Sequence, residues 1–380
     1  MIINSLENFL DSKGLYYDKI DYDVIKNSWN ILSEFVKLPY VIHIVGTNGK
    51  GSTGRYLSSL LVQLNQKVLH YSSPHIVNFN ERIWINGSDV SDSLLHGAHT
   101  KLQSILSSEL LAKLTYFEYT TLLALFLSSE NDYLVLEAGL GGEFDATNVV
   151  KNDLSIITTL GLDHQSFLGD TIELIAATKM RSCDNKFILS NQVFENVKNV
   201  KNEVLKDRIE IELNEYTLCS EAKKLPVYLQ NNLKVVLSVL EYLNFSDFQY
   251  TLPQLVGRYQ RLDSNLIIDV GHNPLAAKAI SKELAKERKK FILVYNSLED
   301  KDFTEVLKIL SPYISEIQII DCDDKRIVKK EILESVIKHL SLTVNPFDIM
   351  KIRKENYYFV FGSFTVVESF LKEYAKYEKR

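Results

Sequence analysis

Cysteine is scarce in this sequence of 380 residues, which has only Cys183, Cys219 and Cys322. They are odd in number and far apart, without the spacing of a metal site, so we expect plain thiols in a reducing compartment and no disulfide framework. No stretch approaches the ~20 apolar residues of a membrane span, and the N-terminus lacks a basic segment followed by an apolar core. We therefore expect a cytoplasmic protein with no membrane partner.

An excess of positive charge is also missing. The sequence has 43 Lys and Arg against 49 Asp and Glu, a formal net charge of -6, which argues against a general nucleic-acid binder. Any anionic substrate must then be met by local cations such as Lys50, Arg82 or Arg258. With 46% hydrophobic residues, 24% charged residues and no internal repeat, the chain is typical of a globular protein with room for two cores.

The chain is organised around residues 41–58, VIHIVGTNGKGSTGRYLS. Residues 41–45 form an apolar, β-branched run that predicts a buried parallel strand, and the helix-like part begins near Ser52. Lys50 adds a cation where a helix N-terminus favours anions. The glycines that would let backbone N–H groups approach phosphate oxygens are Gly46, Gly49 and Gly51. The usual Walker spacing is broken, since Ile44 and Gly51 stand where Gly and Ser or Thr are expected. An ordinary Gly-rich turn is the alternative, but Lys50 with Ser52 favours a phosphate loop.

Short apolar runs alternate with helical periodicity along the rest of the chain. We expect an α/β protein with a P-loop-containing, mostly parallel sheet domain, residues 1–252, that begins with a helical cap. A second, smaller α/β (Rossmann-like) domain should follow over residues 253–380. The expected strands are 41–45, 67–71, 133–142 and 154–164 in the first domain, and 266–269, 290–295, 316–320 and 356–361 in the second. Ligands should collect at the carboxyl ends of these strands.

Seven short motifs fall at or near the expected strand ends. They are GTNGKGS (46–52), SSPHIVNFNERI (72–83), LTYFEYTTL (114–122), LEAGLGGEFDATNVV (136–150), GLDHQSFLG (161–169), GRYQRL (257–262) and DVGHNP (269–274). In this order they resemble the folylpolyglutamate synthase and dihydrofolate synthase family, a branch of the Mur ligase superfamily. The resemblance runs from about residue 20 to the GSFTVV segment. It implies an ATP-dependent ligase that activates a carboxylate as an acyl phosphate, which an amino group then attacks to form an amide.

The resemblance also implies a magnesium site, and Mg²⁺ prefers oxygen ligands and water. Lys50 is expected to contact the γ-phosphate. Ser52, Ser73 of SSPH and Glu137 of LEAGLGG are expected to hold the metal, with His164 of GLDH as a further ligand. Read from the residues alone, Glu137 has the alternative of a strand-end salt bridge. The alternative for His164 is a buried, hydrogen-bonded imidazole.

Lys179 falls where the family has a lysine that is carbamylated and becomes an extra anionic metal ligand. The resemblance therefore implies two Mg²⁺ ions, a carbamate on Lys179, and catalytic roles for Lys50, His164 and Lys179. The surrounding segment departs from the family, which has EKAGI where this chain has TKMRS, with Thr178 in place of the acid. A solvated lysine at a helix end is the alternative.

ATP lies between the two domains in this family. By resemblance, Arg258 of GRYQ reaches the phosphates, Asp269 and His272 of DVGHNP hold the nucleotide, and Asn232 contacts the base side. Asp269 has the alternative of a helix N-cap near Pro274. The expected ATP-binding residues are Asn48, Gly49, Lys50, Gly51, Ser52, Asn232, Arg258, Asp269 and His272.

Two segments indicate which acid is activated. TYFE at 115–118 resembles the pterin-binding segment of bifunctional bacterial members, and FDA at 144–146 matches their LDA. An aromatic ring and a carboxylate together suit a heterocycle with N–H groups. Core packing is the alternative for Phe117. Asp21 lies where the family has IDLG, and Glu143 replaces the arginine of GLGGRLDATN. The expected pterin-binding residues are Asp21, Thr115, Tyr116, Phe117, Glu118, Phe144, Asp145 and Ala146.

The sequence thus predicts a monomeric ligase that uses ATP and Mg²⁺ to join L-glutamate to dihydropteroate and to reduced folates. A monofunctional folylpolyglutamate synthase is one alternative. Another Mur-type ligase is disfavoured, because those enzymes carry a nucleotide-sugar domain before the loop and only 40 residues precede Val41 here. A non-catalytic ATP-binding switch would not need Glu137, His164 and the pterin-like segment together.

Overall fold

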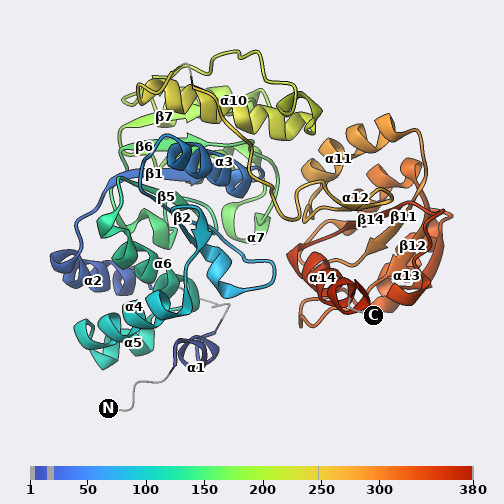
Figure 1. The fold of residues 1–380 in the computed structure, drawn as a ribbon, viewed down its shortest axis with the longest axis horizontal. Coiled ribbons are helices and arrows are strands. Elements are labelled where there is room, and N and C mark those ends of the chain that lie inside the picture. Colours follow the sequence, from blue (N-terminus) through green and yellow to red (C-terminus); the bar gives the residue numbers. More distant parts are fainter. Residues whose placement is uncertain (1–4, 15–20, 247, 379–380) are drawn as a thin grey trace. The chain divides into compact units, whose positions relative to one another are not determined.

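The computed structural model describes residues 5–14, 21–246 and 248–378. These residues belong to two compact units, shown along the chain by colour in Figure 1. The first unit contains Met1–Leu218 and Asn231–Pro253, and the second contains Cys219–Gln230 and Gln254–Arg380. The expected functional division at residues 252 and 253 stays a prediction.

The first unit is built on an eight-stranded sheet in the order β4-β3-β2-β5-β1-β6-β7-β8. Strands β2, β5, β1, β6, β7 and β8 are parallel, and β3 and β4 extend one edge in antiparallel fashion. Their bounds are β1 Tyr40–Val45, β2 Val68–Tyr71, β3 Ile83–Ile85, β4 Ser88–Asp89, β5 Tyr133–Glu137, β6 Leu154–Ile157, β7 Lys186–Leu189 and β8 Ile209–Ile211. Because β1 is central, the side chains of its run VIHIV are all buried, as in a sheet covered on both faces.

Helices cover both faces of this sheet. Figure 1 shows α3 and α10 on one side, and α2, α4, α5 and α6 on the other. The bounds are α1 Leu6–Asp11, α2 Tyr22–Leu32, α3 Lys50–Gln63, α4 Asp92–Ile105, α5 Ser108–Lys113, α6 Tyr116–Leu127, α7 Gln165–Leu168, α8 Ile172–Met180, α9 Asn196–Val204 and α10 Val227–Tyr242. On the α6 side, Leu69 and Leu134 of the sheet join Leu122 of α6 in one buried apolar cluster, so α6 is fixed by apolar burial.

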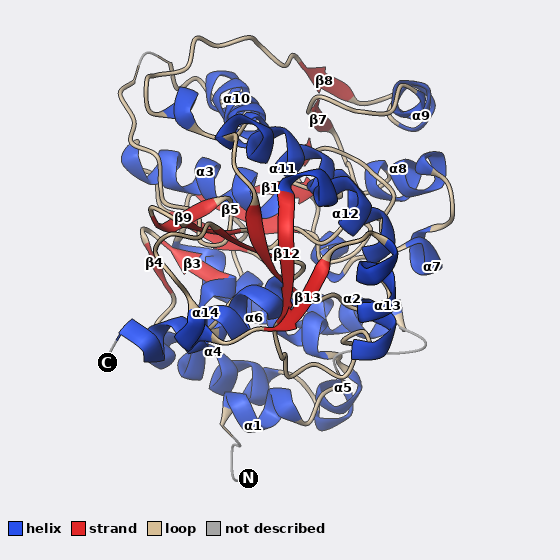
Figure 2. Cartoon of the chain, turned by 90° about the vertical axis from the view of Figure 1, so that its right-hand side faces the viewer, coloured by secondary structure: helices blue, strands red, loops and turns tan. Residues whose placement is uncertain are grey.

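The second unit has a six-stranded sheet in the order β13-β12-β11-β14-β10-β9, in which only β9 is antiparallel to its partner. In Figure 2, where all strands are red, β9, β12 and β13 of this sheet are labelled. The bounds are β9 Gln260–Asp263, β10 Leu266–Ile268, β11 Phe291–Tyr295, β12 Ile314–Ile319, β13 Thr343–Pro346, β14 Tyr358–Phe361, α11 Pro274–Glu287, α12 Phe303–Leu310, α13 Lys330–His339 and α14 Phe364–Glu378.

The predicted fold class is confirmed, since both sheets are mostly parallel and alternate with helices. The expected strands all form, although the runs 133–142 and 154–164 end earlier, at Glu137 and Ile157. None of the helices among the described residues is long and apolar enough to cross a membrane.

Candidate active site

The glycine-rich loop connects the end of β1 to the start of α3. The backbone N–H groups of Thr47 and Asn48 both donate to the carbonyl oxygen of Thr159, at 3.1 Å each. The Thr47 hydroxyl also donates to the Gly161 carbonyl at 3.0 Å. The loop is therefore tied to the chain that follows β6, which fixes its position at the carboxyl edge of the sheet.

Two glycines of this loop allow contacts that a side chain would prevent. A Cβ atom on Gly46 would lie 1.8 Å from Thr158 Oγ1, so the loop can pass this close to the sheet only without a side chain. Gly49 has φ of 93°, in the left-handed region, and a Cβ there would lie 2.9 Å from Asn232 Oδ1. Both positions explain why the sequence places glycine in the turn.

Lys50 is the first residue of α3, and its Nζ donates to the Gly46 carbonyl at 3.3 Å. It forms no ion pair within the described part of the chain. The N–H groups in the first turn of α3, which include those of Gly51 and Ser52, have no acceptor inside the helix. Together they make a cationic, donor-rich helix start that suits phosphate oxygens.

Ser52 and Asn232 lie against each other beneath this loop. Asn232 Nδ2 donates to Ser52 Oγ at 2.8 Å, and Ser52 Oγ donates to the Gly49 carbonyl at 3.1 Å. Both residues are buried. The sequence assigned Asn232 to the base side of ATP, which stays a prediction. What the structure adds is that its amide holds the hydroxyl of Ser52 in place.

Ser73 and Glu137 meet at the adjacent strand ends. Glu137 ends β5, is only 5% exposed, and lies in register with Ile44 of β1. Its Oε2 accepts a hydrogen bond from the Ser73 backbone N–H at 3.4 Å. The described residues contain no group of three or more His, Cys, Asp or Glu arranged to hold a metal. Of the residues expected to hold the metal, only Glu137 and His164 belong to these four types, and so they would not form such a group. The serine and carboxylate oxygens of the expected site are nevertheless ligands that suit Mg²⁺.

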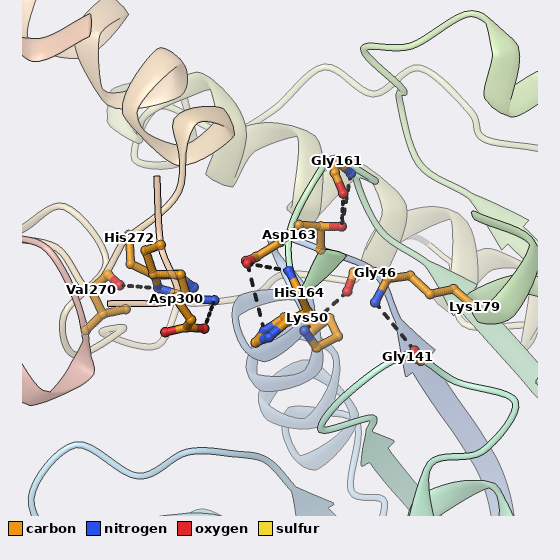
Figure 3. Close-up of polar contacts among 12 residues, drawn as sticks. Gly46, Lys50, Gly141, Gly161, Asp163, His164, Lys179, Val270, His272 and Asp300 are labelled. Carbon is orange, nitrogen blue, oxygen red and sulfur yellow. Dashed lines mark hydrogen bonds and ion pairs between the residues drawn. The ribbon is translucent and has the colours of Figure 1, made fainter. Parts of the chain in front are cut away.

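His164 is the residue before α7 and has a left-handed backbone, with φ of 53°. Its side chain is 37% exposed, so the alternative of a buried imidazole is wrong. Asp163 Oδ1 accepts from the His164 backbone N–H at 2.9 Å and lies 4.0 Å from Nε2 (Figure 3). The neighbouring carboxylate, which the sequence analysis did not single out, thus orients His164 at this edge of the sheet.

Lys179 lies in the last turn of α8 but is only 5% exposed, so the alternative of a solvated lysine is wrong. Its Nζ is 3.5 Å from the Gly141 carbonyl (Figure 3). Burial, with a further contribution from the nearby charge of Lys50, lowers the pKa of Lys179 to about 7, although Asp163 and Asp145 act in the opposite direction. The amine is therefore largely neutral at a pH slightly above 7, the form that reacts as a nucleophile.

The predicted pterin segment begins α6 with a capping box. The Glu118 backbone N–H donates to Thr115 Oγ1 at 3.2 Å, and the Thr115 N–H donates to Glu118 Oε2 at 2.8 Å. Glu118 is only 4% exposed, and its Oε1 has no hydrogen-bond partner among the described residues. Burial raises the pKa of this carboxyl. Glu118 therefore keeps one oxygen for an N–H donor beyond its structural role.

Phe117 lies between the core and the strand ends. Its ring stacks on Tyr71 with centroids 5.9 Å apart. A Cβ on Gly139 would lie 2.6 Å from the Phe117 ring, so the loop after β5 passes directly over it. Phe117 is half-buried against the apolar cluster. Phe117 therefore packs against the core, as the alternative proposed, and the other side of its ring contacts the loop.

Phe144 and Tyr22 form an aromatic pair at the surface, with centroids 5.1 Å apart. Phe144 is 56% exposed. Burial raises the pKa of Tyr22, and the charges of Asp145 and Glu118 raise it further, which places all four side chains in one neighbourhood. Asp21 caps α2 by accepting from the Asp23 N–H at 3.1 Å.

Asp145 is buried and already fully engaged. Its Oδ2 accepts from the Leu140 N–H at 2.8 Å, and its Oδ1 accepts from the Thr147 N–H at 3.0 Å and the Thr147 hydroxyl at 2.5 Å. The adjacent Ala146 begins the short helix Ala146–Val149. Asp145 therefore shapes the loop, whereas Glu118 has the spare oxygen.

Arg258, Asp269 and His272 all lie in the second unit. Asp269 follows β10, and its carboxylate accepts from the Gly271 N–H at 2.7 Å, the Tyr259 N–H at 2.8 Å and the hydroxyl of Tyr228 at 2.9 Å. Burial raises the pKa of Asp269, and the Arg258 cation opposes that rise.

The cap of α11 is Asn273, so the alternative of Asp269 as the N-cap is wrong. The Arg258 guanidinium lies 5.0 Å from the Phe364 ring. His272 Nδ1 is 3.1 Å from the Val270 carbonyl (Figure 3). The second unit therefore holds a cation, an imidazole and a well-anchored carboxylate close to the end of β10.

Within the first unit, the structure gathers the expected phosphate, metal and pterin residues along neighbouring strand ends. Sequence reasoning missed Asp163, Tyr71 and Thr159 as supporting groups. Asp163 could have been found as the acid next to His164, but the other two act through hydrogen bonds or packing that no local pattern reveals. Chemically, this edge offers donors for phosphate, oxygen ligands for a hard cation and an aromatic wall for a ring.

Comparison with known proteins finds relatives of this chain. No model of a protein family matches the chain. The dihydrofolate synthase/folylpolyglutamate synthase of Haemophilus influenzae is 34% identical, over 77% of each sequence. The crystal structure of Helicobacter pylori folylpolyglutamate synthetase is similar with a TM-score of 0.77 and 37% identity, covering 98% of this chain and 100% of that one.

Two further solved structures carry ligands. Escherichia coli FolC in complex with DHPP and ADP has a TM-score of 0.82 and 25% identity, covering 98% of this chain and 97% of that one. A bifunctional folylpolyglutamate synthase/dihydrofolate synthase with Mn, AMPPNP and L-glutamate bound has a TM-score of 0.81 and 25% identity, covering 98% of each chain.

Proposed function

This chain belongs to the dihydrofolate synthase/folylpolyglutamate synthase family, and on that premise we propose that it joins L-glutamate to dihydropteroate and to reduced folates with ATP. Membership confirms the predicted family and the predicted enzyme class, an ATP-dependent acid–amino-acid ligase. The reaction converts a carboxylate of the acid to an acyl phosphate, with ADP leaving. The amino group of glutamate then attacks the acyl carbon, and phosphate leaves as the amide forms.

The observation that carries this proposal is the continuous edge formed by the glycine-rich loop, Glu137 and the pterin segment. Lys50 and the first turn of α3 support binding of the ATP phosphates. The spare oxygen of Glu118, the residue after Phe117, supports binding of a heterocycle with N–H groups. A ligase needs these two sites side by side, because the acid must reach the γ-phosphate.

A divalent metal fits the same edge. Ser52, Ser73 and Glu137 would hold it through oxygen, which is the chemistry that Mg²⁺ prefers. Bound there, the ion would neutralise charge on the phosphate oxygens. A buried, largely neutral Lys179 supports the further prediction that its amine is carbamylated and becomes a ligand beside His164. That Asn232, Arg258, Asp269 and His272 serve the nucleotide stays a prediction from the resemblance.

A monofunctional folylpolyglutamate synthase is the second candidate. The Helicobacter pylori structure, which covers nearly the whole chain, is named for that activity alone, whereas the Haemophilus influenzae relative is named for both. The exposed Phe144 and the acid Glu143 also depart from the family segment that flanks the pterin. Both residues lie beside the expected pterin site, which would select between dihydropteroate and reduced folates.

The deciding experiment measures glutamate-dependent ADP release with dihydropteroate and with tetrahydrofolate as separate acceptors, at saturating ATP and Mg²⁺. The proposal expects turnover with both acids and none without L-glutamate. Turnover with tetrahydrofolate alone would establish the second candidate. Turnover of ATP without either acid would contradict both. The expected monomer and the expected location stay predictions that gel filtration and fractionation can test.

A further inference from the structure

Arg82 ends the short helix Phe79–Arg82 and is only 8% exposed, although its side chain carries a charge. Its Nε donates to His75 Nδ1 at 2.8 Å, which fixes one edge of the guanidinium. The plane is supported from another side by the ring of Tyr116, whose centroid lies 5.2 Å from Cζ. The guanidinium is thus held in one orientation by two aromatic residues.

No anion balances this cation within the described part of the chain. Arg82 has no carboxylate within 4.0 Å there, and its Nη groups form no hydrogen bond. The adjacent acid is not available, because Glu81 accepts from the backbone N–H groups of Ile76, Val77 and Asn78 at 2.7 to 2.9 Å. Burying a charge without a partner costs free energy. A site that contains a buried guanidinium without a carboxylate partner is therefore suited to an anionic ligand.

The position of Arg82 suggests which ligand this is. Its carbonyl oxygen accepts from the Ser72 N–H at 2.8 Å, next to Ser73 of the expected metal site. Its side chain extends to Tyr116, the first residue of α6 and part of the expected pterin segment. Arg82 therefore connects the expected metal site to the expected pterin segment.

We propose that Arg82 binds the α-carboxylate of the glutamyl group in folate acceptors, the carboxylate that does not react. The reacting carboxylate loses negative charge as it attacks the γ-phosphate. A guanidinium bound to that carboxylate would therefore stabilise the ground state more than the transition state, and would slow the reaction. A spectator carboxylate has no such conflict. The inference rests on the proposed function. It makes Arg82 a specificity residue, since dihydropteroate has one carboxylate only, the reacting one.

The test compares the Arg82→Gln and Arg82→Lys variants with the wild type, using each acid in turn. For Arg82→Gln we expect the KM of tetrahydrofolate to rise about 10- to 100-fold, as for loss of a charged hydrogen bond. We expect kcat to change by less than about 2-fold, because the lost interaction is equally strong in the bound substrate and in the transition state. The KM of dihydropteroate should stay nearly constant, and Arg82→Lys should recover part of the folate affinity.

Direct binding supplies a second readout. Titration with tetrahydropteroate, which lacks the glutamyl group, should give the same Kd in wild type and Arg82→Gln, while the Kd of tetrahydrofolate rises. If Arg82→Gln does not fold, His75→Ala keeps the guanidinium but removes its support, and should show the same selectivity more weakly. Arg55→Gln is the matched control. Arg55 lies over the Trp84 ring at 4.9 Å, and its loss should affect both acids equally.

Three outcomes overturn the inference. Equal losses with both acids would place Arg82 in a step that they share. A rise in the KM of L-glutamate in both reactions would assign Arg82 to the incoming amino acid. Unchanged kinetics and binding would leave the cation without this role. Wild-type protein that used neither acid would overturn the proposed function itself, which the other outcomes leave intact.

Discussion

Glu143 and Arg181 form an ion pair with 3.1 Å between Oε2 and Nη1. The Glu143 N–H also donates to the Thr178 carbonyl at 2.9 Å, so the loop after β5 is joined to the last turn of α8 around Lys179. Both positions depart from the family pattern, which has arginine in place of Glu143 and glycine in place of Arg181. The acid at position 143 therefore has a partner in this structure, the arginine at position 181.

Reversing one charge of this pair should destabilise the protein, and reversing both should restore it. Because both side chains are partly exposed, at 51% and 28%, we expect Glu143→Arg to cost less than about 1 kcal/mol. The Glu143→Arg/Arg181→Glu double variant should return to the wild-type midpoint in urea. A double variant that loses as much stability as the two single variants together would show that the pair is not coupled.

Replacing Lys50 by alanine should stop ligation and leave the fold intact. Its only hydrogen bond within the described residues is the 3.3 Å contact with the Gly46 carbonyl. We expect kcat to fall by about 100-fold or more, since a cation at the phosphates acts in the transition state. The urea midpoint should stay unchanged. Lys101→Ala, on the exposed side of α4, is the control and should keep full activity.

The fold could be predicted from the sequence because its strands are apolar runs that end at glycine or polar residues. Such runs reveal strands, as for β1 and β11. Six strands were missed: β3, β4, β7, β8, β9 and β13. They are only two to four residues long, and their pairing depends on neighbours elsewhere in the chain. The local sequence pattern does not reveal a strand whose formation depends on pairing with distant strands.

The phosphate loop was predicted from its own residues, whereas the metal, nucleotide-clamping and pterin residues were predicted only through the family resemblance. Its supporting contacts could not be predicted, because they join positions far apart in the chain. Asn232 and Ser52 are 180 residues apart, and Tyr71 stacks on Phe117. The alternatives for Lys179 and His164 were settled by exposure, which depends on tertiary packing and not on spacing.

Removing the amide of Asn232 should weaken ATP use without a large loss of stability. Its Nδ2 holds Ser52 Oγ, and loss of one neutral hydrogen bond costs about 1 kcal/mol. We expect Asn232→Ala to raise the KM of ATP by about 5- to 10-fold, with the acid and glutamate constants unchanged. Asn231→Ala is the matched control, because no hydrogen bond of its side chain is found among the described residues. Equal effects of both variants would contradict this assignment.

Asp145→Ala should destabilise the loop after β5 and reduce the use of both acids. The substitution leaves the Leu140 and Thr147 N–H groups without their acceptor, which costs about 1–3 kcal/mol for each buried group. Thermal unfolding should report this loss, and Asp145→Asn, which keeps one acceptor oxygen, should be milder. A selective loss of dihydropteroate use at unchanged stability would instead assign Asp145 to direct contact with the pterin.

Lys179 should make stability depend on pH in a defined direction. Its pKa is lowered to about 7, against about 10.4 in the unfolded chain, so between these values only the unfolded chain binds the proton. Stability should rise with pH across that window, and the full penalty should apply below about pH 7. In urea without bicarbonate, Lys179→Met should stabilise the protein by about 4 kcal/mol near pH 6 and hardly at all near pH 10. Lys101→Met should show no such trend.

The same neutral amine underlies the prediction of a carbamate. An uncharged Nζ can attack carbon dioxide, losing a proton as the new C–N bond forms, and the product is an anion that a metal would stabilise. We therefore expect isotope-labelled bicarbonate to give a carbamate signal in NMR spectra of the wild type, and none in Lys179→Ala. Activity should fall as the pH is lowered through about 7, because the protonated amine cannot react. Lys179→Ala should be inactive, and acetate at high concentration should partly restore it by supplying the missing carboxylate. An unmodified Lys179 in active, metal-bound protein would refute this account.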